Sequence, residues 1–493
     1  MSDTTRDPVQ FWSHIDPDRP AIRRGGRTWT YRELDAAVQE SADALFEHGL
    51  GAGEHVSLEF DPAHAMSFVV AWHALHRIDL LPVPIGAKLT DEERQELRSR
   101  AMVDLALTSE AVESEDEASR SGHAAPTVPP PSSPILRRRL DSPAALCFTS
   151  GTTGEPRGAV LTHGNFFWSA IASARNLGVR SGDLWLCCLP LHHVAGISIM
   201  SRSAYYGTEV LLQDGFDANA VNEAIDREGV TLISLVPTML ERLLTARGGR
   251  VFPETLRAAL IGGGPIPPSI LEEAAALRLR ALPTYGLTEA TSQVTTLSLR
   301  EWPEGLDSAG RPLAFTHVEI HDADGRAVAP GEEGEIVVRG ATVMAAYYGS
   351  RETDAEAWHH RWLRTGDIGA WDPAGRLVVL DRRTDRMVVG GENVSPSEVE
   401  RVLRLHPSVL DVAVVGLPSG SRGHEIAAAV LLREGTDITL DELRRHAGAA
   451  LSDFKLPRRL AIADQLPRSN SGKLLRNTLR DWFLAEMAQK ESS

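Results

Sequence analysis

The sequence predicts an α/β fold, with a large N-terminal domain of parallel-type α/β subdomains plus a small β-rich subdomain, and a small α+β domain at the C-terminus. Strand-like and helical patterns alternate from about residue 54 to residue 236, which is typical of parallel sheets. Short alternating strands with turns at 322–325 and 330–331 indicate the β-rich subdomain. A chain of 493 residues is long enough for two to four domains of ordinary size.

The expected elements of the large domain follow in chain order. An amphipathic helix opens at Trp29 and runs to about His48, and a strand covers 54–60. Further strands are predicted at 144–148, 208–213, 230–236 and 256–261. One helix is predicted to begin at Asn165, and another to cover 218–228. The proline-rich stretch 122–133 is typical of an exposed loop or linker.

A compact module follows residue 385. Its pattern predicts a helix at 395–405, strands at 409–415 and 425–432, and a helix at 440–451. About a hundred residues is a usual size for a domain with its own core. We therefore expect this module to be the small α+β domain.

Composition and charge restrict the class of function. The chain carries 51 Lys and Arg against 67 Asp and Glu, and the net charge of −16 disfavours nucleic acid as a partner, since phosphate binding draws on excess basic residues. There is no run of eighteen apolar residues and no leader pattern in 1–8, so we expect a cytoplasmic protein without a membrane span. Cys147, Cys187 and Cys188 lie in apolar segments and are expected in the core rather than in disulfides or a zinc site. The oligomeric state stays open, a homo-oligomer included.

Residues 148–158 read Phe-Thr-Ser-Gly-Thr-Thr-Gly-Glu-Pro-Arg-Gly. The glycines leave backbone N–H groups unobstructed and the hydroxyls place neutral donors beside them, an arrangement that holds phosphate oxygens. The loop of the P-loop nucleotide hydrolases is excluded, because Arg157 is followed by glycine and not by a hydroxyl residue. Composition alone would favour a flexible linker. A predicted strand and helix flank the loop, however, and a loop between strand and helix is where nucleotides bind.

Three further segments combine polar side chains with flexible backbone. Residues 285–289 read Tyr-Gly-Leu-Thr-Glu, and a carboxylate near a triphosphate is useful mainly as a magnesium ligand. Gly262, Gly263 and Gly264 follow a predicted strand and let the backbone approach a flat ligand closely. Asp367, in Thr-Gly-Asp, has a carboxylate of the kind that accepts hydrogen bonds from ribose hydroxyls. Capping a turn at a strand end is its alternative role.

Together these motifs resemble the adenylate-forming superfamily of acyl-CoA ligases, luciferases and peptide-synthetase adenylation domains, over roughly residues 8–480. Residues 466–476, Leu-Pro-Arg-Ser-Asn-Ser-Gly-Lys-Leu-Leu-Arg, are similar to the superfamily element that carries the adenylation lysine. The resemblance implies ATP, Mg²⁺ and CoA as cofactors and co-substrates, and a small carboxylic acid as partner. In the implied reaction the acid attacks the α-phosphorus of ATP and pyrophosphate leaves. A thiol then attacks the acyl carbon and expels AMP.

The resemblance also implies a role for each matching residue. Lys473 bridges the acid and the α-phosphate, Thr288 touches the α-phosphate and Glu289 holds Mg²⁺. The implied ATP and AMP site comprises Thr149, Ser150, Gly151, Thr152, Thr153, Gly154, Arg157, Gly262, Gly263, Gly264, Tyr285, Gly286, Thr288, Asp367 and Arg382. Arg157 stands where relatives more often carry lysine, and both are cations.

The same resemblance implies how the chain is divided. It predicts an N-terminal domain over 1–382, with the β-rich subdomain at about 310–380, a hinge at 383–385 and a mobile C-terminal domain over 386–493. Rotation about Thr384 is expected to withdraw Lys473 and to bring Gly390, Gly391 and Glu392 to the thiol tunnel. Relatives often carry Asp or Lys at the hinge position, where this chain has threonine.

The stretch 190–203 bears on the choice of acid. His193 stands where relatives close the acyl pocket, and it is counted with the catalytic residues. Arg202 lies in an apolar helical stretch, where a buried unpaired cation is costly, so it either reaches solvent or meets a buried anion. With Ser292 and Gln293 as polar contacts, this pattern resembles the 2-succinylbenzoate–CoA ligases of menaquinone biosynthesis, and Arg202 would hold the ring carboxylate of that diacid. The alternatives are a CoA ligase for another aryl or fatty acid, with Arg202 solvated, and a stand-alone adenylation enzyme that loads a carrier protein.

Overall fold

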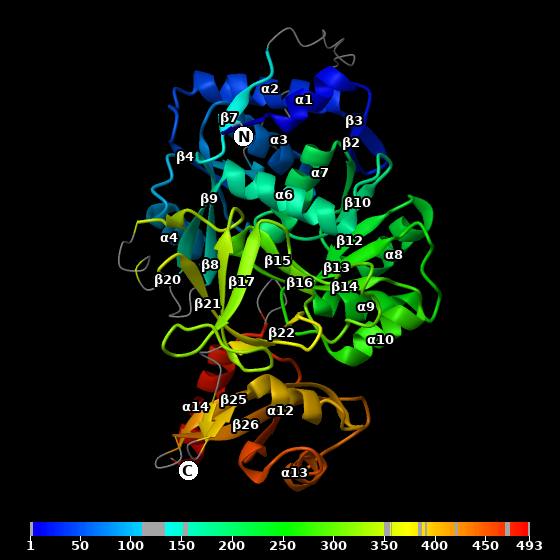
Figure 1. Cartoon of the computed structure of the whole chain (residues 1–493), viewed down its shortest axis with the longest axis vertical. Coiled ribbons are helices and arrows are strands. Elements are labelled where there is room, and N and C mark those ends of the chain that lie inside the picture. The colour runs from blue at the N-terminus through cyan, green and yellow to red at the C-terminus, as the bar shows by residue number, and fades with distance from the viewer. Residues whose placement is uncertain are drawn as a thin grey trace.

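The computed structural model describes residues 3–110, 134–150, 156–349, 355, 357–382, 387–389, 392–419, 423–468 and 474–491. Its large N-terminal part and the small C-terminal domain lie one above the other in Figure 1, with the C-terminal domain at the bottom. The predicted α/β class with a small C-terminal domain is confirmed.

A nine-stranded sheet forms the centre of the large part. Its strand order is β16-β15-β14-β13-β12-β10-β11-β2-β3, and the strands from β14 to β2 run parallel. Their bounds are Pro20–Arg24 (β2), Arg27–Thr30 (β3), Leu184–Cys187 (β10), Glu209–Leu212 (β11), Leu232–Leu235 (β12), Ala258–Ile261 (β13), Ala281–Leu287 (β14), Ser292–Thr296 (β15) and Arg311–Pro312 (β16).

Helices cover both faces of this sheet, as the predicted parallel arrangement requires. Successive residues of β10 show it, because Leu184 and Leu186 enter one apolar cluster while Trp185 and Cys187 enter the other. The covering helices are α8 (Ala218–Arg227), α9 (Pro237–Arg247) and α10 (Pro268–Ala276) on one side, and α2 (Tyr31–Glu47), α3 (Ala65–Arg77), α6 (His163–Leu177) and α7 (Val194–Tyr206) on the other (Figure 1).

Smaller sheets surround the centre. A parallel sheet contains β4 (His55–Glu59), β5 (Leu81–Pro84) and β6 (Leu105–Thr108), with α4 (Asp91–Arg100) beside it. The predicted β-rich part contains β17 (Thr316–His321), β18 (Gly334–Gly340), β20 (Trp358–His359), β21 (Trp362–Trp371) and β22 (Leu377–Arg382). The N-terminal strand β1 (Thr4–Arg6), which precedes α1 (Pro8–Ile15), pairs with β7 (Arg137–Arg139).

The phosphate loop is framed differently from the expectation. Strand β8 (Pro143–Ser150) is paired antiparallel with β9 (Pro156–Thr162), which also pairs with β19 (Ala346–Tyr347). The loop therefore joins two strands of a hairpin, and α6 begins only after β9, so the prediction of a direct strand-to-helix loop was wrong. The sequence did not predict β9, whose apolar residues form only a short run at 159–161.

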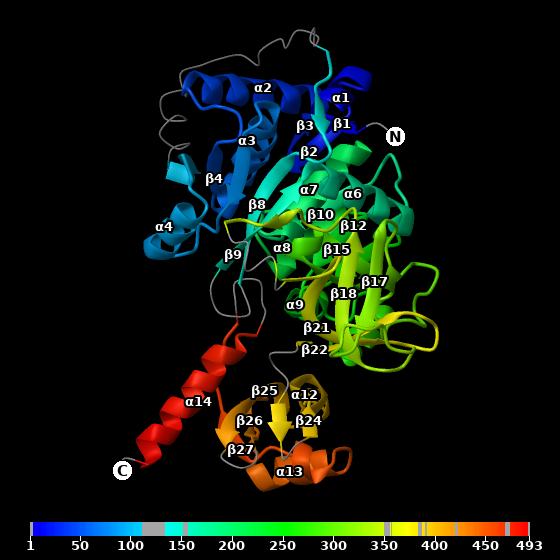
Figure 2. The ribbon, with the colours of Figure 1, turned by 60° about the vertical axis from the view of Figure 1, so that its left-hand side comes forward.

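The C-terminal domain is a five-stranded sheet with helices, close to the prediction. Its strands are β23 (Met387–Val389), β24 (Glu392–Val394), β25 (Val409–Ser419), β26 (Gly423–Leu432) and β27 (Arg459–Ile462). Its helices are α12 (Pro396–Leu403), α13 (Leu440–Gly448) and α14 (Arg476–Glu491). Figures 1 and 2 show that the first residues of α14 lie near the large part and that the helix runs away from that part toward the C-terminus.

Within the described residues, no helix is long and apolar enough to cross a membrane. The three cysteines are buried and form no disulfide bond, and burial raises the pKa of the Cys147 and Cys187 thiols to about 12. Their predicted place in the core is confirmed.

Candidate active site

Segments that the sequence singled out meet at one edge of the nine-stranded sheet. β10, β13 and β14 are parallel strands, so their carboxyl ends lie along the same edge. His193 follows the end of β10, Gly262 follows β13, and Thr288 follows β14 in a short 3₁₀ turn, η2 (Thr288–Ala290). This edge is the usual place for a ligand in an open α/β sheet.

Two glycines in this region have geometric reasons to be glycine. A Cβ on Gly262 would lie 2.7 Å from Thr284 Cγ2, and a Cβ on Gly286 would lie 1.6 Å from the Ser292 carbonyl oxygen. Next to Gly262, Gly263 has a positive φ of 85° and, like Gly264, is exposed, so the backbone at these positions is not covered by a side chain of its own. A flat ring can approach this backbone closely.

Tyr285 and Asp367 meet although 82 residues separate them in the chain. The Tyr285 hydroxyl donates to Asp367 Oδ2 at 2.7 Å, and both side chains are buried. Asp367 lies on β21 directly opposite Arg382 of β22. The structure thus brings the segment 285–289 and the Thr-Gly-Asp segment to one place.

Glu289 is held by residues of the segment 344–347. The Tyr347 hydroxyl donates to Glu289 Oε1 at 2.6 Å, and the Met344 N–H donates to the Glu289 carbonyl oxygen at 2.7 Å. The Arg157 guanidinium lies 5.7 Å from the centre of the Tyr347 ring. Burial and the adjacent Glu289 raise the pKa of Tyr347, so it stays a neutral donor that fixes the carboxylate. No sequence motif marks Tyr347, so its place in the site was not predicted.

Arg202 is buried, with 2% of its surface exposed, so the alternative in which it reaches solvent is excluded. Its Nη2 donates to Ser169 Oγ at 3.1 Å, and its Nε has no hydrogen-bond partner among the described residues. The described residues contain no carboxylate paired with it. Burial lowers the pKa of Arg202 to about 10, the direction expected of a cation without an anion.

The Ser169 hydroxyl connects Arg202 to a second part of the site. It donates to the Thr291 carbonyl oxygen at 3.0 Å while it accepts from Arg202. Thr291 and Ser292 both have positive φ, 53° and 84°, which is costly for residues with a Cβ and persists only where the surroundings hold it. Thr291 Oγ1 also donates to the Thr342 carbonyl oxygen at 2.8 Å. The next residue, Gln293, is buried, and its Oε1 has no partner among the described residues.

His192 and His193 lie side by side before α7, with ring centres 4.3 Å apart. Burial lowers the pKa of His193, and burial together with His193 lowers the pKa of His192 to about 3. Both rings are therefore neutral at ordinary pH. A neutral half-buried ring at the end of β10 can line an apolar pocket without adding charge.

Several predicted site residues lie outside the described residues. These are Gly151, Thr152, Thr153, Gly154, Thr384, Gly390, Gly391 and Lys473. Ser150, Arg382 and Glu392 are described only as backbone of β8, β22 and β24, whereas Thr149 is half-buried and pairs with Arg157 across the hairpin. The roles assigned to these residues remain predictions.

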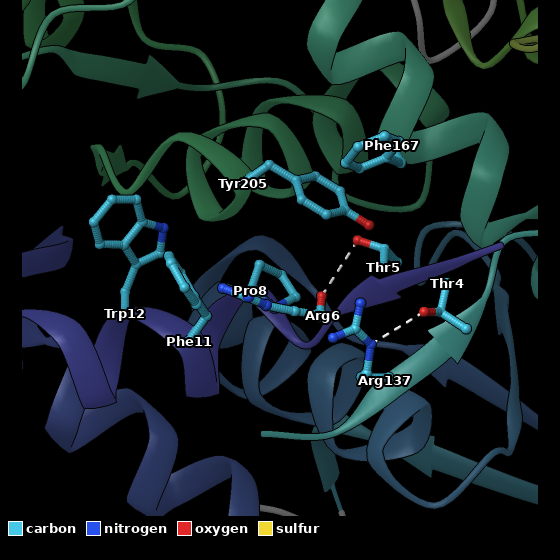
Figure 3. A pocket seen from close by; sticks show the side chains of 9 residues that line it. All are labelled: Thr4, Thr5, Arg6, Pro8, Phe11, Trp12, Arg137, Phe167 and Tyr205. Carbon is cyan, nitrogen blue, oxygen red and sulfur yellow. Dashed lines mark hydrogen bonds between the residues drawn. The ribbon is translucent and has the colours of Figure 1, made fainter. Parts of the chain in front are cut away.

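A surface cavity of about 260 Å³ opens at a different corner of the molecule. Figure 3 shows Phe11 and Trp12 of α1 on one side, and Phe167 of α6 and Tyr205 of α7 on the other. Its lining includes none of the predicted site residues. The cavity lies where the N-terminal segment packs against α6 and α7.

Comparison with known proteins identifies the family of the chain. The chain matches the model of the AMP-binding enzyme family over residues 10–348 and that of the AMP-binding enzyme C-terminal domain over residues 398–473. The chain therefore belongs to the AMP-binding enzymes, the class that the fold and the carboxyl-edge site define.

Within this family the chain is similar to proteins named 2-succinylbenzoate–CoA ligase. That of Bacillus mycoides is 36% identical over 94% of this chain and 96% of its own length. The o-succinylbenzoate CoA synthetase (MenE) of Bacillus subtilis, in complex with the acyl-adenylate OSB-AMP, is 35% identical and covers 97% of this chain and 98% of its own, with a TM-score of 0.87. Its complex with ATP and magnesium ion also scores 0.87, at 34% identity and coverages of 97% and 100%. A double mutant bound to the product analogue OSB-NCoA scores 0.71, at 34% identity and coverages of 97% and 99%.

Proposed function

We propose that this protein joins 2-succinylbenzoate to CoA in two steps, with ATP consumed to AMP and pyrophosphate. The observation that carries the choice of acid is the buried Arg202, which has a free Nε and no carboxylate partner among the described residues. A buried cation without an anion is costly unless a ligand supplies one. The likeness to the Bacillus ligases over nearly the whole chain supports the same choice.

In the first step a carboxylate oxygen of the succinyl chain attacks the α-phosphorus of ATP and pyrophosphate leaves. In the second step the CoA sulfur attacks the acyl carbon and the thiol proton passes to solvent. The bond between the acyl carbon and the phosphate oxygen then breaks, and AMP leaves with that oxygen. The ring carboxylate is not consumed, so it is free to remain against Arg202 throughout. Ser292 and the unpartnered Gln293 Oε1 would complete the polar end of the acyl pocket, and neutral His193 would line its wall.

The nucleotide would occupy the carboxyl edge described above. Gly262, Gly263 and Gly264 offer bare backbone to the adenine with Tyr285 along it, and Asp367, with Arg382 opposite, would accept from the ribose hydroxyls. We assign the phosphates to the loop Thr149–Arg157 and to Thr288, and the bridging of acid and α-phosphate to Lys473.

Glu289 has the donor chemistry that Mg²⁺ prefers, and Tyr347 holds its carboxylate in place. When bound, magnesium would neutralise charge on the phosphates as pyrophosphate departs. The partners we propose are thus the diacid, ATP and CoA, and not nucleic acid. We propose the cytoplasm as the place where the protein acts.

The test is pyrophosphate release with matched acids, each with and without CoA. 2-Succinylbenzoate is compared with 4-oxo-4-phenylbutanoate, which lacks only the ring carboxylate, and with benzoate and octanoate. We expect a preference for the diacid over its matched monoacid of at least about 100-fold, since a charge-assisted contact to a buried cation is involved. CoA-thioester should form when CoA is present. Equal rates with the matched pair would discard the role of Arg202, and adenylate without thioester would favour an enzyme that loads a carrier protein.

A further inference from the structure

A buried carboxylate bridges the large part and the C-terminal domain. Asp381, on β22, accepts hydrogen bonds from the Ser395 hydroxyl and from Ser397 Oγ at 3.1 Å, with the Ser397 N–H at 3.5 Å. Only 7% of Asp381 is exposed. Ser395 and Ser397 belong to the start of α12, the first helix of the C-terminal domain.

The partners of Asp381 make this a directed contact. Ser395 caps α12, because its Oγ accepts from the Glu398 N–H at 3.1 Å, and its own proton goes to Asp381. The positive end of a helix also favours a carboxylate. Burial raises the pKa of Asp381 above its ordinary range, against the lowering effect of Ser395 and Arg476, so the hydroxyl donors are what keep a carboxylate at this depth.

The contact spans the predicted hinge. Asp381 precedes residues 383–386, which lie outside the described residues, and Ser395 follows them. A rotation of the C-terminal domain about residue 384 would carry Ser395 and Ser397 away from Asp381, since β22 stays with the large part. Charges of the C-terminal domain also act across the same boundary: burial raises the pKa of Glu241 on α9, and Asp411 raises it further while Arg404 lowers it.

The contact also lies next to the nucleotide side of the site. On the β21–β22 ladder, Asp381 pairs with Ile368, and the next pair is Arg382 with Asp367. Asp367 is the carboxylate that holds the Tyr285 hydroxyl. Asp367 is therefore one residue pair along the ladder from Asp381, and a shift of Asp367 would be felt at the contact with the C-terminal domain.

The related structures contain more than one arrangement. The OSB-AMP complex and the OSB-NCoA complex of the Bacillus subtilis protein each cover 97% of this chain, but their TM-scores against it are 0.87 and 0.71. A lower score at equal coverage indicates that the matched parts are arranged differently. The present structure, in which Asp381 contacts α12, is the more similar to the acyl-adenylate complex.

We propose that Asp381 is a positioning residue that latches the C-terminal domain in the arrangement used for adenylate formation, and that this latch opens before the thioester forms. The proposal rests on the two-step reaction of the proposed function. The latch biases an equilibrium between two arrangements of the domains. Loss of its hydrogen bonds therefore shifts population from the arrangement used for adenylate formation to the one used for thioester formation.

The experiment measures the two half-reactions separately in Asp381→Ala. Adenylate formation is followed as pyrophosphate release without CoA, and thioester formation is followed with supplied acyl-adenylate and CoA. We expect the first rate to fall by about 10-fold and the second to stay equal or rise, because removing a charged hydrogen-bond acceptor shifts a two-state balance by roughly that factor. Asp381→Asn keeps one acceptor oxygen and should recover part of the first rate.

Ser397→Ala tests the latch from the other side. This variant removes a donor to Asp381 but leaves the Ser395 cap of α12. It should therefore change the two rates in the directions expected of Asp381→Ala, and it provides the test if Asp381→Ala folds poorly. The double variant Asp381→Ala with Ser397→Ala should be no worse than Asp381→Ala alone. The matched control is Asp372→Ala, because Asp372 holds Arg376 within the β21–β22 turn and does not reach the C-terminal domain. It should leave the ratio of the two rates unchanged.

A readout independent of activity completes the test. The native cysteines are buried, so cysteines introduced at the exposed positions Glu254 and Arg445 can carry a fluorescent donor and acceptor. We expect Asp381→Ala to populate a second distance that the unmodified protein shows rarely. An unchanged distance distribution, or an equal loss in both half-reactions, overturns the latch. Absence of pyrophosphate release by the unmodified protein would instead overturn the proposed function, and the distance measurement would still decide the latch.

Discussion

Two buried arginines of the large part have opposite surroundings. Arg257 donates to both oxygens of Asp183, at 2.8 and 2.6 Å, and to the carbonyl oxygens of Leu177 and Gly178. Arg202 is as deeply buried, yet it has one hydroxyl, Ser169, and an unpartnered Nε within the described residues. The fold provides charged and carbonyl partners for the first arginine, whereas we propose that the second is completed by a carboxylate of the bound acid. On this proposal the first arginine is structural and the second binds a ligand.

The largest expected effect is on stability, in Arg257→Met. Methionine has a similar length without the charge, so the change leaves Asp183 buried and without its cation. Removing one partner of a buried ion pair costs about 3–5 kcal/mol. We expect the free energy of unfolding, from denaturant titration, to fall by that amount while kcat per folded molecule is preserved. A loss below about 1 kcal/mol would remove the structural role of the pair.

The matched variant Arg202→Met should show the reverse pattern. Removing the Arg202 guanidinium leaves no buried carboxylate unpaired among the described residues, so the free energy of unfolding should stay equal or rise. With 2-succinylbenzoate, kcat/KM should fall about 100-fold, or roughly 3 kcal/mol, since the ring carboxylate would then be buried without a cation. Its kcat/KM with 4-oxo-4-phenylbutanoate should be unchanged. Parallel losses with both acids would place Arg202 among the structural arginines.

The smallest expected effect concerns Ser169→Ala, which removes the acceptor that orients Arg202 and the donor to Thr291. We expect KM for 2-succinylbenzoate to rise about 5-fold, near 1 kcal/mol, with KM for ATP unchanged. Ser169→Thr keeps the hydroxyl and should restore the lower KM. Ser173→Ala, one turn further along α6, is the control, and equal effects at residues 169 and 173 would mean that the helix packing alone is responsible.

The sequence predicted the elements whose signal is local. The strands β11 and β12, the helix predicted to begin at Asn165 and the glycines at 262–264 are visible in short windows, because side-chain period and backbone freedom are local properties. β9 was missed because its only apolar residues are a short run at 159–161 that follows the glycine-rich loop directly, and so short a run gives no periodic signal.

The site was predicted only where a motif marked it. Tyr285 and Asp367 were each recognised through the superfamily resemblance, but their direct hydrogen bond depends on how β14 meets β21. Ser169 was an ordinary serine in a helical pattern, and its importance appears only when Arg202 lies against it. Asp381 and Ser397 gave no signal at all, since a contact between two domains leaves no periodic trace in the chain.

The pairing of β1 with β7 means that the start of the chain is fastened to a segment more than a hundred residues later. Asp7 forms ion pairs with Arg138 at 3.0 Å and with Arg77 at 3.4 Å, and the Leu140 N–H donates to the Asp3 carbonyl oxygen. The β1–β7 pairing, the Asp7–Arg138 ion pair and the Leu140–Asp3 hydrogen bond join the two sides of the stretch 111–133. We therefore expect a chain cut once within that stretch to give two fragments of unequal length that still assemble, so that recovery of activity on mixing would report on whatever brings them together.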